Sequence, residues 1–305
     1  MTTDTNVSGV WSGWDRADLV RVGLRGIGQV MFQDHAGTGL LFLIGIAWAS
    51  PLMGVGAVIG AIIGPAVAFL MGFDRKEIEA GIHGFNPVLV GAGLMAFLQP
   101  VLLTWVFVVV GCVAATFVCY LARRYLKFPT YTAPFVVTTW LLIAVAHAIA
   151  GTAIDVVSAP VVETPIGFFQ GLLLKGVAQV FFMGNVVTGI LLLVGIALSD
   201  WRHAVIALLG SLVGTALGVY HNDPATKISI GIYGYNASLA AMAVYLWRKS
   251  LLLSILGAAI AIPMTEVFPG WLGIPALTAP FVMATWIVLA IGQLESVFVG
   301  ERAPA

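Results

Sequence analysis

The nine residues TAPFVVTTW at 132–140 return with two changes as TAPFVMATW at 278–286. Just ahead of each copy, Pro129 falls on Pro275 at the same shift of 146 residues. A shared apolar composition would predict repeated leucine and valine, whereas threonine, proline and tryptophan recur here. The match therefore indicates an internal duplication of the chain.

The duplication extends toward the N-terminus at a shift of 150 residues. GIHGFNPVL at 81–89 falls on GIYGYNASL at 231–239, and GQVMFQDHAGTG at 28–39 falls on AQVFFMGNVVTG at 178–189. A four-residue gap accounts for the difference between the two shifts. Matches in order over most of the chain predict two copies of one unit.

The composition is that of a membrane protein. Hydrophobic residues make up 60% of the 305 residues and charged residues 9%, whereas a soluble domain carries about 25% charged residues. The apolar runs are continuous rather than alternating, which predicts helical spans and disfavours a transmembrane β-barrel. The expected fold class is an all-α integral membrane protein. The net charge of zero gives no reason to expect a nucleic-acid partner.

Ten apolar segments predict about ten transmembrane spans, five in each half. Additional half-membrane pore helices are expected around the Gln29/Gln179 and Asn86/Asn236 motifs, because irregular backbone at membrane depth must line a cavity or be buried. An odd number of spans per copy makes the second copy enter from the opposite side, which predicts two inverted five-helix repeats. The segments lie near 36–52, 53–73, 87–99, 100–122, 132–152, 186–199, 203–221, 236–247, 250–268 and 278–299.

The positive charges predict the orientation. With the N-terminus in the cytoplasm, only Lys227 of the 14 lysines and arginines falls clearly outside, and Lys175 is ambiguous. This distribution follows the positive-inside rule and places both termini in the cytoplasm. The predicted domains are a cytoplasmic N-terminal segment, a first membrane repeat, an external connection, a second membrane repeat and a C-terminal tail: 1–20, 21–152, 153–170, 171–299 and 300–305.

The residues that match between the halves are neutral polar or aromatic. In an inverted repeat, such pairs lie near the midplane, where a permeation path tends to run. Amide and hydroxyl oxygens accept hydrogen bonds and aromatic faces can sandwich a flat molecule, so the set suits a small, neutral, planar solute and excludes ions. The alternatives for each are structural: the amides bond neighbouring helices, the threonines bond backbone carbonyls one turn earlier, and the rings are core. The pairs are Gln29/Gln179, Phe32/Phe182, Phe85/Tyr235, Asn86/Asn236, Leu89/Leu239 and Thr139/Thr285.

The motifs Q-V-x-F, G-[FY]-N-x-x-L and T-A-P-F-V-x-x-T-W, each present twice, resemble those of the urea transporter family. The resemblance covers roughly residues 20–300, and in length the chain is similar to the bacterial members. It implies ten spans with two half-membrane helices, and a homotrimer in the lipid bilayer of the bacterial inner membrane with one pore per subunit. It also implies passive, channel-like conduction of urea through a filter of oxygen ladders and aromatic slots, with no cofactor and no metal.

The resemblance also assigns roles to residues of this chain. It implies that Gln29 and Gln179 flank the oxygen ladders and that Thr139 and Thr285 meet at the central constriction. In two places the chain departs from the pattern: Gln179 stands where some relatives carry glutamate, and Tyr235 stands where phenylalanine would match the first half. The remaining implied pathway residues follow the glutamines in their motif or form slot walls: Val30, Val180, Phe32, Phe182, Phe85, Leu89, Tyr235 and Leu239.

Other functions stay open at the level of sequence. A channel for ammonia or another small amide is the first alternative, although no paired histidines match between the halves. An ion-coupled secondary transporter would normally keep charged residues inside the membrane. An intramembrane enzyme would need a nucleophile with a base, or clustered metal ligands, and the sequence shows no such motif.

Overall fold

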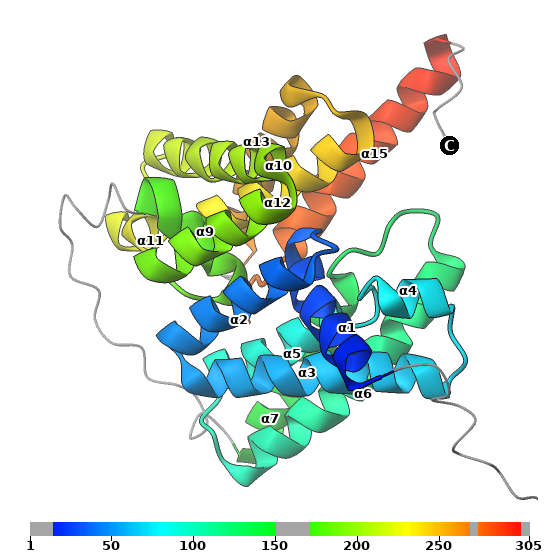
Figure 1. Cartoon of the computed structure of the whole chain (residues 1–305). Coiled ribbons are helices and arrows are strands. Elements are labelled where there is room, and N and C mark those ends of the chain that lie inside the picture. The colour runs from blue at the N-terminus through cyan, green and yellow to red at the C-terminus, as the bar shows by residue number, and fades with distance from the viewer. Residues whose placement is uncertain (1–14, 151–170, 269–273, 300–305) are drawn as a thin grey trace, which may run out of the picture.

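In this computed structural model, the described residues are 15–150, 171–268 and 274–299, and these form helices and short turns without a strand. The predicted external connection at 153–170 and tail at 300–305 lie outside the described residues. The first half, blue to green in Figure 1, comprises α1 (Arg16–Gly28), the 3₁₀ turn η2 (Gln29–Met31), α2 (Ala36–Ala49), α3 (Pro51–Leu70), α4 (Arg75–Glu79), α5 (Phe85–Phe97), α6 (Leu102–Tyr125) and α7 (Ala133–Ala150).

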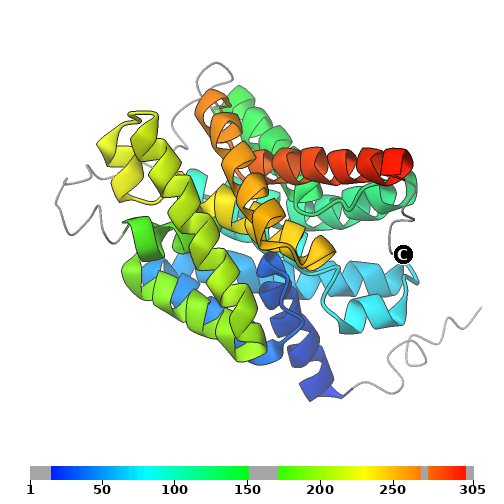
Figure 2. The ribbon, with the colours of Figure 1, turned by 90° about the horizontal axis from the view of Figure 1, so that it is seen from above.

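The second half repeats this series in the same order. Both halves place a short 3₁₀ turn and a five-residue helix at equivalent places in the series. The elements are the π-helix η4 (Gly171–Lys175), α9 (Gly176–Ala178), the 3₁₀ turn η5 (Gln179–Phe181), α10 (Val186–Tyr220), α11 (Ala225–Ser229), α12 (Gly234–Arg248), α13 (Leu251–Val267) and α15 (Ala279–Val299). In this series η4 and α9 take the place of α1, and the kinked α10 takes the place of α2 and α3. The two halves lie against each other, with α2 packed on α10 (Figures 1 and 2).

Four helices of the described chain are long and apolar enough to cross a membrane: α3, α6, α7 and α10. The pair Arg16–Met31 and Ala36–Ala49 would add a fifth crossing, bent by 75°. Helix α10 covers two predicted spans, and its backbone is extended at Asp200 with φ −151° and ψ 112°, so it is two helical segments joined at a kink. Helices α5 and α13 and the Ala279–Gln293 part of α15 are apolar but shorter.

The sequence sets the beginnings of the helices locally. Asp15 and Asp18 form a capping box at the start of α1, each side chain accepting a hydrogen bond from the other's backbone N–H. His35 accepts from the N–H of Thr38 at the start of α2, and Asn185 accepts from the N–H of Thr188 at the start of α10. Different residue types therefore perform the same capping role in the two halves.

Close helix packing in each half depends on glycine. A Cβ atom built at Gly60 of α3 would collide with the backbone carbonyl of Pro87 in α5. One built at Gly210 of α10 would lie 2.7 Å from the carbonyl oxygen of Ala237 in α12. The absence of a side chain at these positions lets the two backbones approach, as small residues do in membrane helix pairs.

The contacts between the halves are reciprocal. The hydroxyl of Thr38 donates to the carbonyl of Gly195 over 2.6 Å, and the hydroxyl of the equivalent Thr188 donates to the carbonyl of Gly45 over 2.8 Å. The same donor and acceptor positions are thus used twice, once in each direction between the halves. Two copies of one unit that are related by a two-fold axis make contacts of this kind.

The repeated motif at 132–140 and 278–286 makes further contacts that are reciprocal between the halves. The indole N–H of Trp140 donates to the carbonyl of Pro275 and that of Trp286 to the carbonyl of Pro129, both over 2.8 Å. The hydroxyls of the equivalent Thr132 and Thr278 hydrogen-bond directly to each other over 2.6 Å. A residue that meets its own counterpart lies on or beside the axis, so this motif marks the centre of the relation between the halves.

Candidate solute pathway

One mouth of the candidate pathway is a cavity of about 470 Å³. Four of the predicted pathway residues line it together, namely Gln29, Val30, Phe32 and Phe85. The rest of its wall combines apolar, aromatic, hydroxyl and cationic side chains. These residues are Ile82, Arg123, Lys127, Phe128, Pro129, Thr130, Tyr131 and Thr132. Segments more than 100 positions apart in the sequence thus converge on one polar and aromatic space.

The two motif glutamines occupy equivalent positions and make equivalent bonds. The side-chain N–H of Gln29 donates to the carbonyl of Ala80 over 2.9 Å, and that of Gln179 donates to the carbonyl of Ile230 over 2.8 Å. Each amide nitrogen therefore holds the turn that precedes α5 or α12. This commitment leaves the side-chain carbonyl of each glutamine as the group that can accept a hydrogen bond from a solute.

The motif asparagines serve the backbone. Asn86 accepts from the N–H of Phe135 over 3.0 Å, and Asn236 accepts from the N–H of Phe281 over 3.2 Å. Their amide nitrogens donate to the carbonyls of Tyr131 and Leu277. Because the first N–H groups of a helix lack partners within it, these side chains satisfy the starts of α7 and α15. For this pair, the structure therefore supports a role in capping the backbone rather than in contacting a solute.

Aromatic rings surround both phenylalanines of the Q-V-x-F motifs. Both residues have the left-handed backbone conformation, with φ 62° at Phe32 and 63° at Phe182. The ring of Phe32 lies edge-on to Phe281 with centroids 6.0 Å apart, and that of Phe182 lies edge-on to Phe97 at 5.4 Å. This backbone conformation is uncommon for a residue other than glycine, and it occurs at the same position in both halves. It turns each phenylalanine ring away from the direction that a continued helix would give it.

Tyr235 differs from its counterpart Phe85 by a hydroxyl group. That hydroxyl donates to the backbone carbonyl of Leu277 over 2.6 Å, and the side chain is buried. The structure thus gives the hydroxyl a structural partner. The four aliphatic pathway candidates are fully or almost fully buried, with at most 1% of their surface exposed: Val30, Leu89, Val180 and Leu239.

Thr139 and Thr285 are the clearest candidates for solute contact. Both are completely buried, and neither hydroxyl has a hydrogen-bond partner among the described residues. A buried hydroxyl left unpaired costs about 1–3 kcal/mol, so two such groups at equivalent positions require an explanation. The neighbouring Thr138 hydroxyl is also unpartnered, whereas its counterpart is Ala284.

Buried threonines in three other helices, α6, α10 and α13, show that an unpartnered hydroxyl is not general in this fold. Thr116 donates to the carbonyl of Cys112, Thr215 to that of Ser211 and Thr265 to that of Ala261, each one turn earlier. This backbone bond was the structural alternative for Thr139 and Thr285, and neither of them makes it. Their hydroxyls are therefore available to another acceptor or donor.

Sequence reasoning missed several of the contributing residues. It matched Thr132 to Thr278 but did not predict that their hydroxyls bond to each other and join the two halves. Their match at the shift of 146 residues indicated only that they hold equivalent positions in the two halves. It did not single out Tyr131, Phe97 or Phe281 as ring neighbours of the motif phenylalanines.

The fold and the site define a helical membrane protein with an internally duplicated candidate pathway for a small polar solute, lined mainly by neutral polar and aromatic side chains. A family model described as "Urea transporter" matches residues 20–293, and the chain belongs to this family.

Curated relatives agree with this assignment. The chain is 30% identical over 300 residues to urea transporter 1 of Capra hircus and 29% identical over 298 residues to urea transporter 1 of Ovis aries. Each alignment covers 88% of this chain and 76% of the relative. Urea transporter 1 of Rattus norvegicus is 28% identical over the same shares of the two chains.

Proposed function

We propose that this chain conducts urea passively through a narrow, neutral filter at the centre of the duplicated fold. The observation that carries the mechanism is the pair of fully buried, unpartnered hydroxyls of Thr139 and Thr285. Urea offers four N–H donors and one carbonyl, so threonine hydroxyls and glutamine carbonyls replace part of its lost hydration. Membership of the urea transporter family and the names of its relatives support urea as the solute.

In this proposal the twelve predicted pathway residues have distinct tasks. The carbonyls of Gln29 and Gln179 begin the oxygen ladders, and Thr139 and Thr285 form the central constriction. The cavity beside Gln29 and Phe32 is the cytoplasmic mouth. Rings and aliphatic side chains form the flat slots that admit a planar solute: Val30, Phe32, Phe85, Leu89, Val180, Phe182, Tyr235 and Leu239.

The membrane arrangement that we propose is two inverted repeats with ten spans. The matching series of elements in the two halves supports it, and so do the reciprocal bonds of Trp140 and Trp286. The kink at Asp200 divides α10 into two segments that correspond to two predicted spans. A two-fold axis in the membrane plane brings equivalent residues together at mid-depth.

We further propose that the protein is a homotrimer of the bacterial inner membrane with one pore in each subunit and both termini in the cytoplasm. The predicted domains at 1–20, 21–152, 153–170, 171–299 and 300–305 follow from this topology. The distribution of lysine and arginine supports the orientation. Labelling of single cysteines at Arg124 and Lys227 with a membrane-impermeant reagent tests it, because only the second should react from outside.

The decisive experiment is stopped-flow urea flux in proteoliposomes. The wild-type rate should rise in proportion to urea concentration and should not change when a proton or sodium gradient is collapsed. Thr139→Val and Thr285→Val each remove a hydroxyl at nearly constant volume, and each should lower urea flux about three- to tenfold, the effect of losing about 1 kcal/mol.

The matched control is Thr116→Val, which removes a buried hydroxyl that already bonds a backbone carbonyl. Its urea flux should equal that of the wild type if the protein reconstitutes normally. Wild-type flux in both Thr139→Val and Thr285→Val would refute the site assignment. Flux that follows an ion gradient would instead favour a coupled transporter, and methylamine flux faster than urea flux would favour an ammonia channel.

A further inference from the structure

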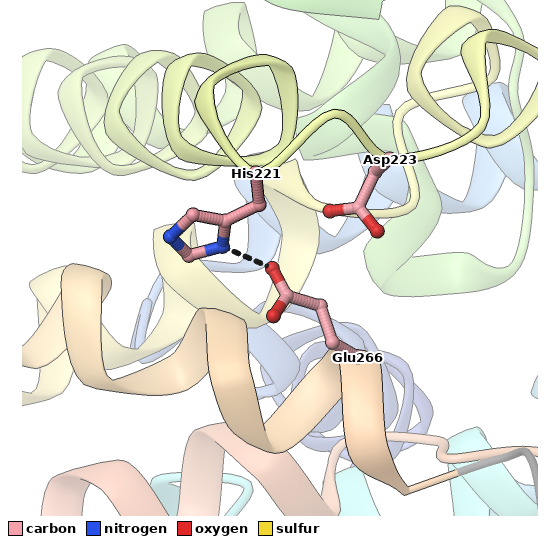
Figure 3. A group of neighbouring side chains, drawn as sticks. All are labelled: His221, Asp223 and Glu266. Atoms are coloured by element: carbon pink, nitrogen blue, oxygen red, sulfur yellow. Dashed lines mark hydrogen bonds and ion pairs between the residues drawn. The ribbon is translucent and has the colours of Figure 1, made fainter.

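Three side chains that commonly bind metals gather where α10 and α13 end (Figure 3). His221 follows the last residue of α10, Asp223 lies in the turn after it, and Glu266 lies on the last turn of α13. One ligand atom from each residue lies within 4.8 Å of the other two. His221 Nδ1 and a carboxylate oxygen of Glu266 are 2.6 Å apart.

The duplication shows that the fold does not require these groups. At a shift of 150 residues, His221 and Asp223 correspond to Met71 and Phe73. At the shift of 146 residues, Glu266 corresponds to Tyr120. This second register holds within the helices, because Cys119 and Thr265, one residue earlier, both contact the amide nitrogen of the motif asparagine in their own half.

In the first half, the equivalent place is an aromatic stack. The rings of Phe73 and Tyr120 lie parallel, with centroids 4.4 Å apart and planes 8° from each other. The stack links the turn after α3 to the end of α6 by dispersion and apolar contact. The second half has exchanged both rings for carboxylates, Asp223 and Glu266, at the same junction.

Two carboxylates that replace a stacked pair repel each other unless a positive charge lies between them. His221 reaches the Glu266 carboxylate. The Oδ2 atom of Asp223 is shielded from solvent and has no partner at hydrogen-bond distance among the described residues, and the polar group that faces this carboxylate is the hydroxyl of Tyr233. A shielded carboxylate oxygen without a partner is costly, and a cation held between the two acids would satisfy it.

We propose that His221, Asp223 and Glu266 bind a divalent first-row transition-metal ion, with Zn²⁺ as the model ligand. One imidazole nitrogen and two carboxylate oxygens form a donor set that suits Zn²⁺ and its neighbours better than the all-oxygen shells that Ca²⁺ and Mg²⁺ prefer. Zn²⁺ binds such atoms at about 2.0–2.2 Å, so ligand atoms within 4.8 Å of one another converge on one ion after small side-chain rotations.

The bound ion would link the end of α10 to the end of α13, the task that the Phe73–Tyr120 stack performs in the first half. None of the three ligands belongs to the predicted pathway, so the inference goes beyond the proposed function and does not rest on it. No metal was expected from the sequence, and the three residues, spread over 46 positions, form no compact motif.

The test is calorimetric titration of Zn²⁺ into purified, tag-free protein in detergent micelles. The expected result is saturable binding of one ion per chain. Co²⁺ should bind competitively and give visible absorption bands of nitrogen and oxygen coordination. Absence of saturable Zn²⁺ binding by the folded protein would overturn the proposal, since the cluster would then be an ion pair alone.

Two variants locate the binding. His221→Met installs the residue of the first half, and Glu266→Gln keeps the shape of the side chain. Substituting a residue that only hydrogen-bonds a metal ligand typically weakens metal binding by about 10–100-fold. Removing a ligand itself should therefore weaken Zn²⁺ binding by more than about 100-fold. Binding at wild-type affinity by both variants overturns the proposal.

The matched control is His35→Asn, which removes another imidazole while installing the residue of the second half. Asn185 caps α10 as His35 caps α2, so the variant should fold and bind Zn²⁺ with wild-type affinity. Equal weakening in His35→Asn would show that histidines bind the ion at random, and would also overturn the proposal. Elution as a single detergent complex establishes that each variant is folded before titration.

Discussion

The two halves of the molecule agree at its centre and differ at its ends. At the centre, Thr132 meets Thr278 and the two motif tryptophans exchange equivalent bonds across the halves. At the ends, one junction is an aromatic stack and the other a histidine–carboxylate group. Residues that must contact their own counterparts are constrained by both copies at once, whereas the residues of each junction contact one another within a single half. The two halves thus share one backbone arrangement, and the helix ends that lie away from the contact between the halves are free to differ.

The largest effect should come from the glycines that let the helices of each half approach. Gly60→Ala and Gly210→Ala place a methyl group against a backbone carbonyl that has little room to move, so the cost should lie at or above the upper end of the about 1–3 kcal/mol typical of overpacking. Both variants should therefore lose thermal stability to a similar extent. The measurement is the midpoint temperature for loss of the monodisperse elution peak in detergent.

Gly45→Ala serves as the control for this pair. Its added methyl group would meet side chains at 3.4 Å or more rather than backbone, so the variant should stay within a few degrees of the wild type. If Gly60→Ala were tolerated and Gly210→Ala were not, the helices would pack differently in the two halves. That result would contradict the equivalence of the two halves.

The threonine pair between the halves should give a smaller effect with a distinctive pattern. Thr132→Val or Thr278→Val alone leaves the other buried hydroxyl without its partner, which costs about 1–3 kcal/mol. The double variant removes both hydroxyls, so its loss of stability should be clearly smaller than the sum of the two single losses. A double-mutant cycle on the same thermal midpoint checks this, and additive losses would mean that the two hydroxyls do not interact.

The smallest effect should follow from Tyr235→Phe, which makes the second half match Phe85 of the first. The lost hydroxyl bonds the carbonyl of Leu277, and that carbonyl also accepts from Asn236 over 3.4 Å. The expected loss is about 1 kcal/mol or less, with the ratio of urea flux to formamide flux unchanged. A changed ratio in proteoliposomes would show that the hydroxyl faces the solute, and would sharpen the comparison at the pathway itself.

The sequence was sufficient for the repeat and for much of the helical layout. The segments predicted near 53–73, 100–122 and 132–152 correspond to α3, α6 and α7 within a few residues. The family assignment from the three motifs is confirmed by the match over 20–293. These features are local, since each depends on apolar run length or on residue identity within a short stretch.

What the sequence could not provide depends on how the halves face each other. Matching Thr132 to Thr278 shows that they are equivalent, but only the orientation of the two copies decides that they touch. In the same way, the Gln29 side chain has an oxygen and a nitrogen, and the fold decides that the nitrogen binds the carbonyl of Ala80. The His221–Asp223–Glu266 group was hidden because it exists in one half only and joins two separate helix ends.

The exchange of bonds between the halves has a consequence for how such a chain arises. Thr38 donates to Gly195, which corresponds to Gly45, and Thr188 donates to Gly45 itself. A single half therefore already contains both the donor and the acceptor of this contact, and the tryptophan–proline contacts obey the same rule. Two separate molecules of one ancestral half would satisfy each of these bonds as a homodimer before any gene fusion joined them.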